Sequence, residues 1–199
     1  MLKTYGLLGL IQLLYFKVRT KFVFSKARII RFPFRIRGKQ CITVGDGFTT
    51  GFNCRLDAFN INNRSEPLIT IGKNVQINDD VHIGATEKIE IHDNVLIASK
   101  VFITDHNHGK YSGPGADSPK TIPDDRPIYS SPVVIEKNVW IGEFVSILPG
   151  VTIGEGSVVG TMSVVNKSVP PFCIVVGSPA RIVKKFDFDK NEWISVKND

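Results

Sequence analysis

The chain has 199 residues, of which 42% are hydrophobic and 22% are charged, and its formal net charge is +6. This composition excludes a disordered chain and predicts one domain with a substantial core and terminal appendages. The three cysteines lack CxxC or Cys/His spacing, which argues against a zinc site or a disulfide framework and fits a reducing cytoplasm. Residues 1–45 hold ten cations and no acid, so the basicity is local and does not predict nucleic-acid binding.

Residues 1–40 form a basic amphipathic segment with an apolar run from Tyr5 to Phe16. The run predicts a helix over residues 2–17, and it is shorter than the about 20 apolar residues that span a bilayer. Its cations mostly follow the apolar run, whereas a secretory signal has them ahead of it. Two interpretations stay open. The helix packs on the folded core or on a neighbouring subunit, or it makes a peripheral contact with an anionic inner membrane.

Residues 28–56 read as short strands, and Pro33 places its strand at an edge or an end of a sheet. Further along, an aliphatic residue returns at every sixth position, at Ile71, Ile77, Ile83, Ile91, Ile97, Ile103, Ile135, Ile141, Ile147, Ile153, Val159 and Val165. Glycine follows several of these positions, which suits a backbone that turns tightly. A helix requires a period near 3.6, so the sequence predicts a parallel β-solenoid over residues 41–169, of undetermined hand.

The repeat slips by two residues between Ile83 and Ile91, within the sequence GATEKIEI. An excursion at a corner of a solenoid can shape a cleft. We therefore expect a substrate site among the polar residues that precede the slip, which are Asn78, Asp79, Asp80 and His82. His82 and His92 both fall on polar positions of the repeat, where a solvated or turn-capping histidine is usual.

The repeat is lost over residues 104–132, which are rich in Gly, Pro and Asp. A loop of this length inside a compact domain is usually functional or disordered. It begins with two of the four histidines, which favours function. Asp105 and Asn107 are expected to shape the turn. The pair His106 and His108 lacks the further ligands of a metal site, so no metal is predicted.

The segments NVLIASKVFITDHNHG, VWIGEFVSILPGVTIGEGSVVGTMSVV and GSPARIVKK resemble the hexapeptide-repeat acyltransferases that use acetyl-CoA. The likeness covers about residues 40–185. It is strongest to bacterial lipopolysaccharide and O-antigen O-acetyltransferases, with galactoside and maltose acetyltransferases more distant. The resemblance implies a left-handed β-helix and a homotrimer in which the long loop embraces the next subunit.

By this resemblance His108, five residues after Ile103, is the catalytic base, and His106 is its rival or a substrate contact. A base that titrates near neutral pH suits proton removal from a sugar hydroxyl, which is a poor nucleophile. Tyr129, in the motif YSSP, is assigned to the substrate site. Asn78 takes the place of a sugar-binding asparagine, but Thr86 stands where the galactoside enzymes have its acidic partner.

The resemblance also implies a coenzyme A site and a C-terminal segment, residues 170–199, that contacts the coenzyme and ends in a short helix or tail. The implied coenzyme contacts are Trp140, Glu143, Thr161, Asn166, Lys167, Arg181 and Lys184. Lysine and arginine suit a polyanion.

Three functions remain open for the chain. The first is acetyl-CoA-dependent O-acetylation of a sugar hydroxyl of a cell-surface polysaccharide or its precursor, in the cytoplasm or at the inner membrane. The second is N-acetylation of a nucleotide-linked amino sugar. The third is a non-catalytic β-solenoid scaffold, which would have no reason to keep both a loop histidine and a cationic coenzyme motif.

Overall fold

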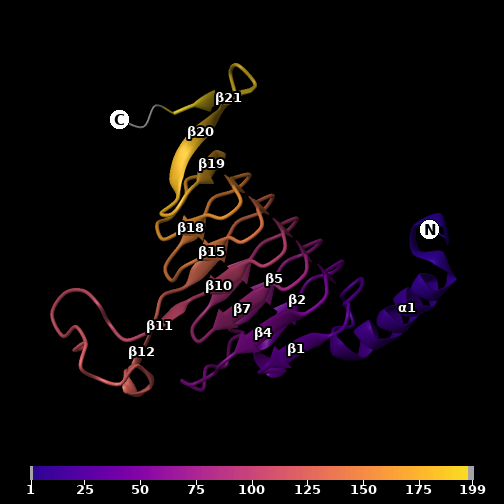
Figure 1. The fold of residues 1–199 in the computed structure, drawn as a ribbon, viewed down its shortest axis with the longest axis horizontal. Coiled ribbons are helices and arrows are strands. Elements are labelled where there is room, and N and C mark those ends of the chain that lie inside the picture. The colour runs from indigo at the N-terminus through magenta and orange to yellow at the C-terminus, as the bar shows by residue number, and fades with distance from the viewer. Residues whose placement is uncertain (1, 197–199) are drawn as a thin grey trace.

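The computed structural model describes residues 2–196 and shows a β-solenoid with a helix at its N-terminal end (Figure 1). Helix α1 spans Leu2–Val23, and a 3-10 turn, η1, spans Lys39–Cys41. The strands then visit three sheets in a fixed rotation, so that each turn of the chain contributes one strand to each sheet. This is the parallel solenoid that the six-residue repeat predicts.

The first sheet contains β3 (Thr49–Thr50), β6 (Gln76–Ile77), β9 (Leu96–Ile97), β14 (Trp140–Ile141), β17 (Val158–Val159), β19 (Cys173–Val176), β20 (Arg181–Asp187) and β21 (Glu192–Ser195). The second sheet contains β1 (Phe34–Arg37), β4 (Cys54–Ala58), β7 (His82–Ala85), β10 (Phe102–Thr104), β15 (Ser146–Ile147) and β18 (Val164–Val165). The third sheet contains β2 (Ile42–Val44), β5 (Ile69–Ile71), β8 (Ile89–Ile91), β13 (Val133–Ile135) and β16 (Thr152–Ile153).

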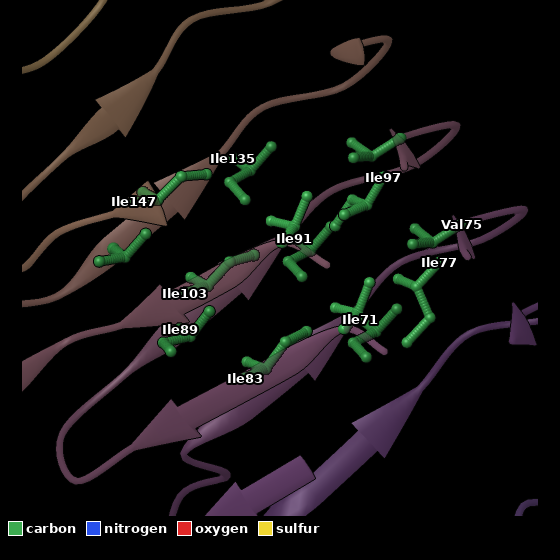
Figure 2. Close-up of a cluster of buried hydrophobic side chains, with 14 of the residues drawn as sticks. Ile71, Val75, Ile77, Ile83, Ile89, Ile91, Ile97, Ile103, Ile135 and Ile147 are labelled. Carbon is green, nitrogen blue, oxygen red and sulfur yellow. The ribbon is translucent and has the colours of Figure 1, made fainter. Parts of the chain in front are cut away.

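The repeat isoleucines fill the interior of the solenoid. Figure 2 shows them stacked coil upon coil, and Ile77, Ile83 and Ile103 are fully buried. Equivalent repeat positions pair in neighbouring strands: Ile77 lies opposite Ile97 in the first sheet, and Ile83 lies opposite Ile103 in the second. Each buried aliphatic side chain contributes about 1.5–3 kcal/mol to folding, so the stack is the main source of stability.

Glycine follows the repeat aliphatic for a different reason from the tight turn that we predicted. Neither Gly142 nor Gly154 has a positive φ, whereas turn residues such as Asn74 (φ 54°) and Asp80 (φ 58°) do. A Cβ on Gly154 would lie only 2.3 Å from the backbone nitrogen of Pro171 in the next coil. Close approach of successive coils, rather than left-handed backbone, therefore requires these glycines.

The predicted slip and the predicted loop lie at the same corner, between the second and third sheets. The slip falls in the turn of residues 86–88 between β7 and β8, and the loop leaves after β10 and returns to β13. Within the loop, β11 (His106–His108) pairs antiparallel with β12 (Ile128–Ser130), and η2 (Pro123–Asp125) precedes β12. Figure 1 shows the loop projecting from the solenoid. We call this corner the histidine corner.

Helix α1 runs to Val23, six residues beyond the predicted range of 2–17. One of its faces packs on the solenoid: Phe16 is 3% exposed, and the buried Thr20 hydroxyl accepts a hydrogen bond of 2.7 Å from the Ile30 amide. The C-terminal part of the helix thus packs on the solenoid, as the first interpretation of this segment predicts, while Figure 1 shows its N-terminal part extending outward. Within residues 2–196, no helix combines the length and the apolarity that crossing a bilayer takes.

The prediction of a C-terminal helix is wrong. Strands β20 and β21 form an antiparallel hairpin whose turn contains Asn191 with a φ of 54°. Phe186 packs on Phe188 and on Trp193, with ring centroids 5.0 and 5.2 Å apart. The residues FDFD, from Phe186 to Asp189, alternate apolar and polar side chains, which is a strand pattern, and the segment has no apolar period near 3.6.

Candidate active site

Two histidines approach each other over the outward side of the second sheet. On β7 the side chain of Ile83 is buried in the core, so His82 and Gly84 occupy the outward positions beside it. The chain after β10 brings His106 back over Gly84. A Cβ on this glycine would lie 3.7 Å from His106 Cε1 and 3.7 Å from His82 Nε2. The absent side chain leaves the space in which both imidazoles lie.

The His106 imidazole is oriented by a buried carboxylate. Its Nδ1 lies 2.9 Å from Asp105 Oδ1 and 3.2 Å from Thr104 Oγ1. The backbone amides of residues 86–88 donate hydrogen bonds of 2.7–3.1 Å to the Asp105 carboxylate. Burial raises the pKa of Asp105, but the hydrogen bonds from His106 and these amides outweigh it and bring that pKa below its ordinary value. The ionised carboxylate holds Nδ1–H, which leaves Nε2 free to accept a proton.

The His82 imidazole also has a carboxylate partner. Its Nε2 lies 3.2 Å from Asp57 Oδ2 on the neighbouring strand β4, and Arg55 Nε donates to the same oxygen. The other oxygen, Asp57 Oδ1, is buried without a hydrogen bond among the described residues, and Arg37 Nε lies 3.7 Å away. Burial and the charge of Arg55 lower the pKa of His82, although Asp57 opposes them. His82 is therefore neutral at pH 7, and Asp57 has a free acceptor.

His108 lies at the end of β11, exposed to solvent. Its backbone pairs with Ile128 of β12, and its carbonyl oxygen accepts a hydrogen bond from the Tyr111 hydroxyl. Within residues 2–196 its ring makes no hydrogen bond or ion pair. In one chain, then, His108 lacks the orienting partner that His106 has.

The loop is tied to the histidine corner by hydroxyl groups. Ser130 Oγ lies 2.7 Å from Thr86 Oγ1, and that hydroxyl lies 3.3 Å from Asp105 Oδ1. Tyr129 is exposed on β12, opposite Asn107 of β11. Asp105 thus fixes the turn of residues 86–88 that carries Thr86, and Thr86 places no carboxylate here.

The other predicted substrate residues lie at a different corner, between the first and second sheets. Asn78, Asp79 and Asp80 form the turn between β6 and β7. Asp79 Oδ1 accepts a hydrogen bond of 2.7 Å from the Phe52 amide, so this carboxylate holds the neighbouring coil. Asn78 and Asp79 line a hollow of about 240 Å³ together with Arg31. Of the four polar residues that precede the slip in the repeat, only His82 lies beside His106.

A larger hollow of about 420 Å³ lies around the exposed His92 and Lys137, at the corner between the third and first sheets. It does not include either histidine–aspartate pair. We therefore locate the chemistry from the paired side chains and not from the size of the hollow.

The predicted coenzyme residues are all exposed or half-buried, and they spread over two corners and the first sheet. They are Glu143 and Thr161 at the corner of Asp79, Asn166 and Lys167 at the histidine corner after β18, Trp140 on β14, and Arg181 and Lys184 on β20. Lys167, Arg181 and Lys184 make no ion pair with any residue between 2 and 196. Exposed cations can bind phosphate groups, so these three stay candidates for the coenzyme A site.

All three cysteines are buried, and two of them are poor candidates for the nucleophile of a covalent mechanism. Burial raises the pKa of the Cys54 thiol to about 11, and it also raises the pKa of Cys173. Thiols with a raised pKa stay protonated at neutral pH and react poorly. Within the described chain there is also no group of three or more His, Cys, Asp or Glu side chains placed to hold a metal ion.

Sequence reasoning missed two carboxylates of this site. Asp105 does more than shape its turn, because it also orients His106. Asp57 stands out in the sequence only when the register is known, since it pairs with Gly84 one coil further on.

Comparisons with known proteins define the class. The family described as bacterial transferase hexapeptide (six repeats) matches residues 132–167. The putative lipopolysaccharide biosynthesis O-acetyl transferase WbbJ of Escherichia coli (strain K12) is 47% identical over 193 residues, which cover 96% of this chain and 95% of WbbJ. The galactoside O-acetyltransferase of the same strain is 37% identical over 126 residues, which cover 63% of this chain and 58% of that enzyme.

Solved structures agree with this class. A variant of AntD, an N-acyltransferase from Bacillus cereus in complex with dTDP-4-amino-4,6-dideoxyglucose and coenzyme A, has a TM-score of 0.70 and 26% identity. The match covers 87% of this chain and 90% of that chain.

The chain therefore belongs to the hexapeptide-repeat acetyltransferases. It is an acyltransferase whose acyl donor is acetyl-CoA, and its parallel sheets and N-terminal helix fit the left-handed β-helix. WbbJ aligns with this chain over nearly the whole length of both chains.

Proposed function

We propose that this chain O-acetylates a sugar hydroxyl of a bacterial cell-surface polysaccharide, O-antigen or lipopolysaccharide, or of its precursor. The carrying observation is the His106 imidazole, which buried Asp105 holds by Nδ1 beside a second imidazole, His82. The alignment with WbbJ, named as a putative lipopolysaccharide biosynthesis O-acetyl transferase, supports the acceptor class.

The proposed reaction is direct transfer with a histidine as general base. The imidazole takes the proton of the sugar hydroxyl. At the same time the hydroxyl oxygen attacks the carbonyl carbon of the thioester. The C–S bond then breaks, and the proton passes to the departing thiolate, giving an O-acetyl sugar and coenzyme A. The oxyanion that forms in between needs hydrogen-bond donors, a role that backbone amides near the coil edge are proposed to fill.

The two loop histidines compete for the role of base. The resemblance favours His108, whereas the geometry within one chain favours His106, because Asp105 fixes its tautomer and leaves Nε2 free. We propose His106 as the base and His108 as a residue that meets the acceptor or the next subunit. We propose that His82, which is only half-buried beside His106, contacts the acceptor, and that buried Asp57 positions the His82 ring.

We also propose a homotrimer with active sites between subunits. The histidine corner and the corner of Asn78, Glu143 and Thr161 lie at different edges of the second sheet, so one chain does not bring them together. Neighbouring solenoids packed side by side bring one such corner of each chain together.

The free cysteines fit a reducing cytoplasm.

A second candidate function is N-acylation of a nucleotide-linked amino sugar. The likeness to AntD, an N-acyltransferase bound to an amino-sugar nucleotide, is the observation that favours it. An amine that is already neutral needs less help from a base than a hydroxyl does, so the two reactions differ in their dependence on histidine.

The test is an acetyl-CoA consumption assay against O-antigen fragments, lipid-linked glycans and amino-sugar nucleotides. O-acetylation predicts turnover with hydroxyl acceptors and a product ester that mild base cleaves. Turnover only with amino-sugar nucleotides, and a base-stable amide product, would establish the second candidate instead. Turnover with none of these acceptors would favour the non-catalytic scaffold.

A further inference from the structure

Helix α1 has a second apolar face, which nothing in the described chain covers. Seven of its large hydrophobic side chains are more than half exposed, with Leu8 at 82% and Phe22 at 81%. They are Leu7, Leu8, Ile11, Leu14, Tyr15, Val18 and Phe22. At 3.6 residues per turn these positions form one stripe along the helix, opposite the buried Phe16 and Thr20. We call this set the α1 stripe.

The surroundings of the stripe are strongly basic. Residues 1–45 contain no acid, and of the nine cations from Lys17 to Lys39 only Arg37 lies within ion-pair distance of a described carboxylate. Lys17 and Lys21 border the stripe on one side. Most of these cations are exposed, so ion pairs within the described chain leave most of the positive charge of this end uncompensated.

A groove joins the apolar surface to these cations. It has a volume of about 340 Å³, and its walls are Leu10, Leu13, Leu14 and Ile29, with Lys17 and Arg28 also lining it. An apolar trough with an ammonium and a guanidinium group suits an amphiphile that has an acyl chain and an anionic headgroup. Figure 1 shows α1 extending outward from the end of the solenoid, on the side away from the β11–β12 loop.

We propose that the α1 stripe lies in the interface of an anionic lipid bilayer, with a lipid of that bilayer seated in the groove. A second copy of this chain is a poorer partner for the face, because its own α1 would bring another uncompensated basic segment against the first. Shallow insertion of an exposed apolar helix face that is bordered by cations is typical of peripheral membrane attachment. This contact does not depend on the proposed reaction.

The test uses the full chain and measures co-sedimentation with phosphatidylglycerol vesicles, with phosphatidylcholine vesicles as the neutral comparison. We expect binding to phosphatidylglycerol alone, weakening as salt rises because the Debye length falls below about 10 Å above 0.1 M. Replacing Leu8, Ile11 and Phe22 by Gln should lower binding by tenfold or more. Replacing Lys17 and Arg28 by Gln should lower it by about fivefold for each charge.

The matched control is the pair of exposed aliphatic residues Ile61 and Ile122, which lie outside α1. Replacing both by Gln should leave vesicle binding unchanged, and the α1 variants should keep their melting temperature and their turnover of a soluble acceptor. Vesicle binding that survives the Leu8, Ile11 and Phe22 substitutions would overturn the proposal. So would a fall in molar mass of these variants by light scattering without any effect on vesicles, which would assign the stripe to a second copy.

Discussion

The imidazoles of His82 and His106 share one space, the one that Gly84 leaves open between them. Each ring lies 3.7 Å from the point that a Cβ on Gly84 would occupy, and each is held by its own carboxylate, Asp57 or Asp105. The two carboxylates come from different coils. The register of the solenoid therefore brings the two histidine–aspartate pairs together. The lack of a side chain at Gly84 leaves room for both rings.

The first prediction concerns Gly84. A methyl group at this position meets only ordinary contacts, so Gly84→Ala should fold normally and keep most activity. The branched side chain of Gly84→Val should displace both rings and lower kcat by tenfold or more, with a change in melting temperature of only a few degrees. Steady-state kinetics and a thermal melt of both variants check this, and equal activity of the Val and Ala variants would contradict it.

The second prediction separates the two loop histidines. A general base contributes about 10²–10⁴-fold in rate, so His106→Ala should lose that factor in kcat while the melting temperature and coenzyme A binding stay nearly constant. His108→Ala should affect KM for the acceptor more than kcat. The opposite pattern, with near-normal kcat for His106→Ala and a collapse for His108→Ala, would return the role of base to His108.

The third prediction concerns Asp105→Asn. An asparagine cannot accept the hydrogen bonds of three backbone amides and of His106 at once, and an unsatisfied buried donor costs about 1–3 kcal/mol. The urea midpoint should fall accordingly, and kcat should fall with it because the tautomer of His106 is no longer fixed. The pKa of Asp105 is lowered on folding, so the ionised carboxylate stabilises the folded protein. This contribution to the free energy of unfolding is complete above the ordinary pKa of Asp and is lost as the pH falls through the pKa of Asp105 in the folded protein. An unchanged urea midpoint would contradict this assignment.

The fourth prediction concerns pH and His82. Burial and Arg55 lower the pKa of His82 in the folded protein, so the unfolded chain binds the proton more readily. The contribution of His82 to the free energy of unfolding is therefore greatest above pH 6.5. It is lost as the pH falls toward the pKa of His82 in the folded protein. His82→Gln should therefore show a smaller fall in melting temperature than the parent between pH 6.5 and about 5. His92→Gln, at an exposed histidine, is the control and should retain the parental slope.

How far the sequence predicts this molecule depends on the range of the contacts involved. The period of six predicts the solenoid, because every buried isoleucine repeats the same local environment. The lost period predicts the loop after Ile103 and its two histidines. Asp57 could not be predicted as the partner of His82, because the two belong to different coils and meet only through the sheet register. The C-terminal hairpin was missed although FDFD alternates, because β20 is held by antiparallel pairing with β19 of the solenoid, a contact that the sequence of the tail does not reveal.

The last prediction tests whether two chains form one active site. The histidines lie at one corner of the solenoid, whereas Glu143 and Thr161 lie at another, and the cations that fit coenzyme A include Arg181 on the C-terminal hairpin. In the proposed trimer, His106→Ala chains and Arg181→Ala/Lys184→Ala chains, whose substitutions lie on the C-terminal hairpin, are each nearly inactive alone. Mixing them after dissociation and reassembly should restore a fraction of parental turnover, because some interfaces then pair an intact histidine corner with an intact coenzyme surface. The parental mass by light scattering should equal three chains. An active monomer, or a reassembled mixture without any gain over the separate variants, would show that one chain contains the whole site.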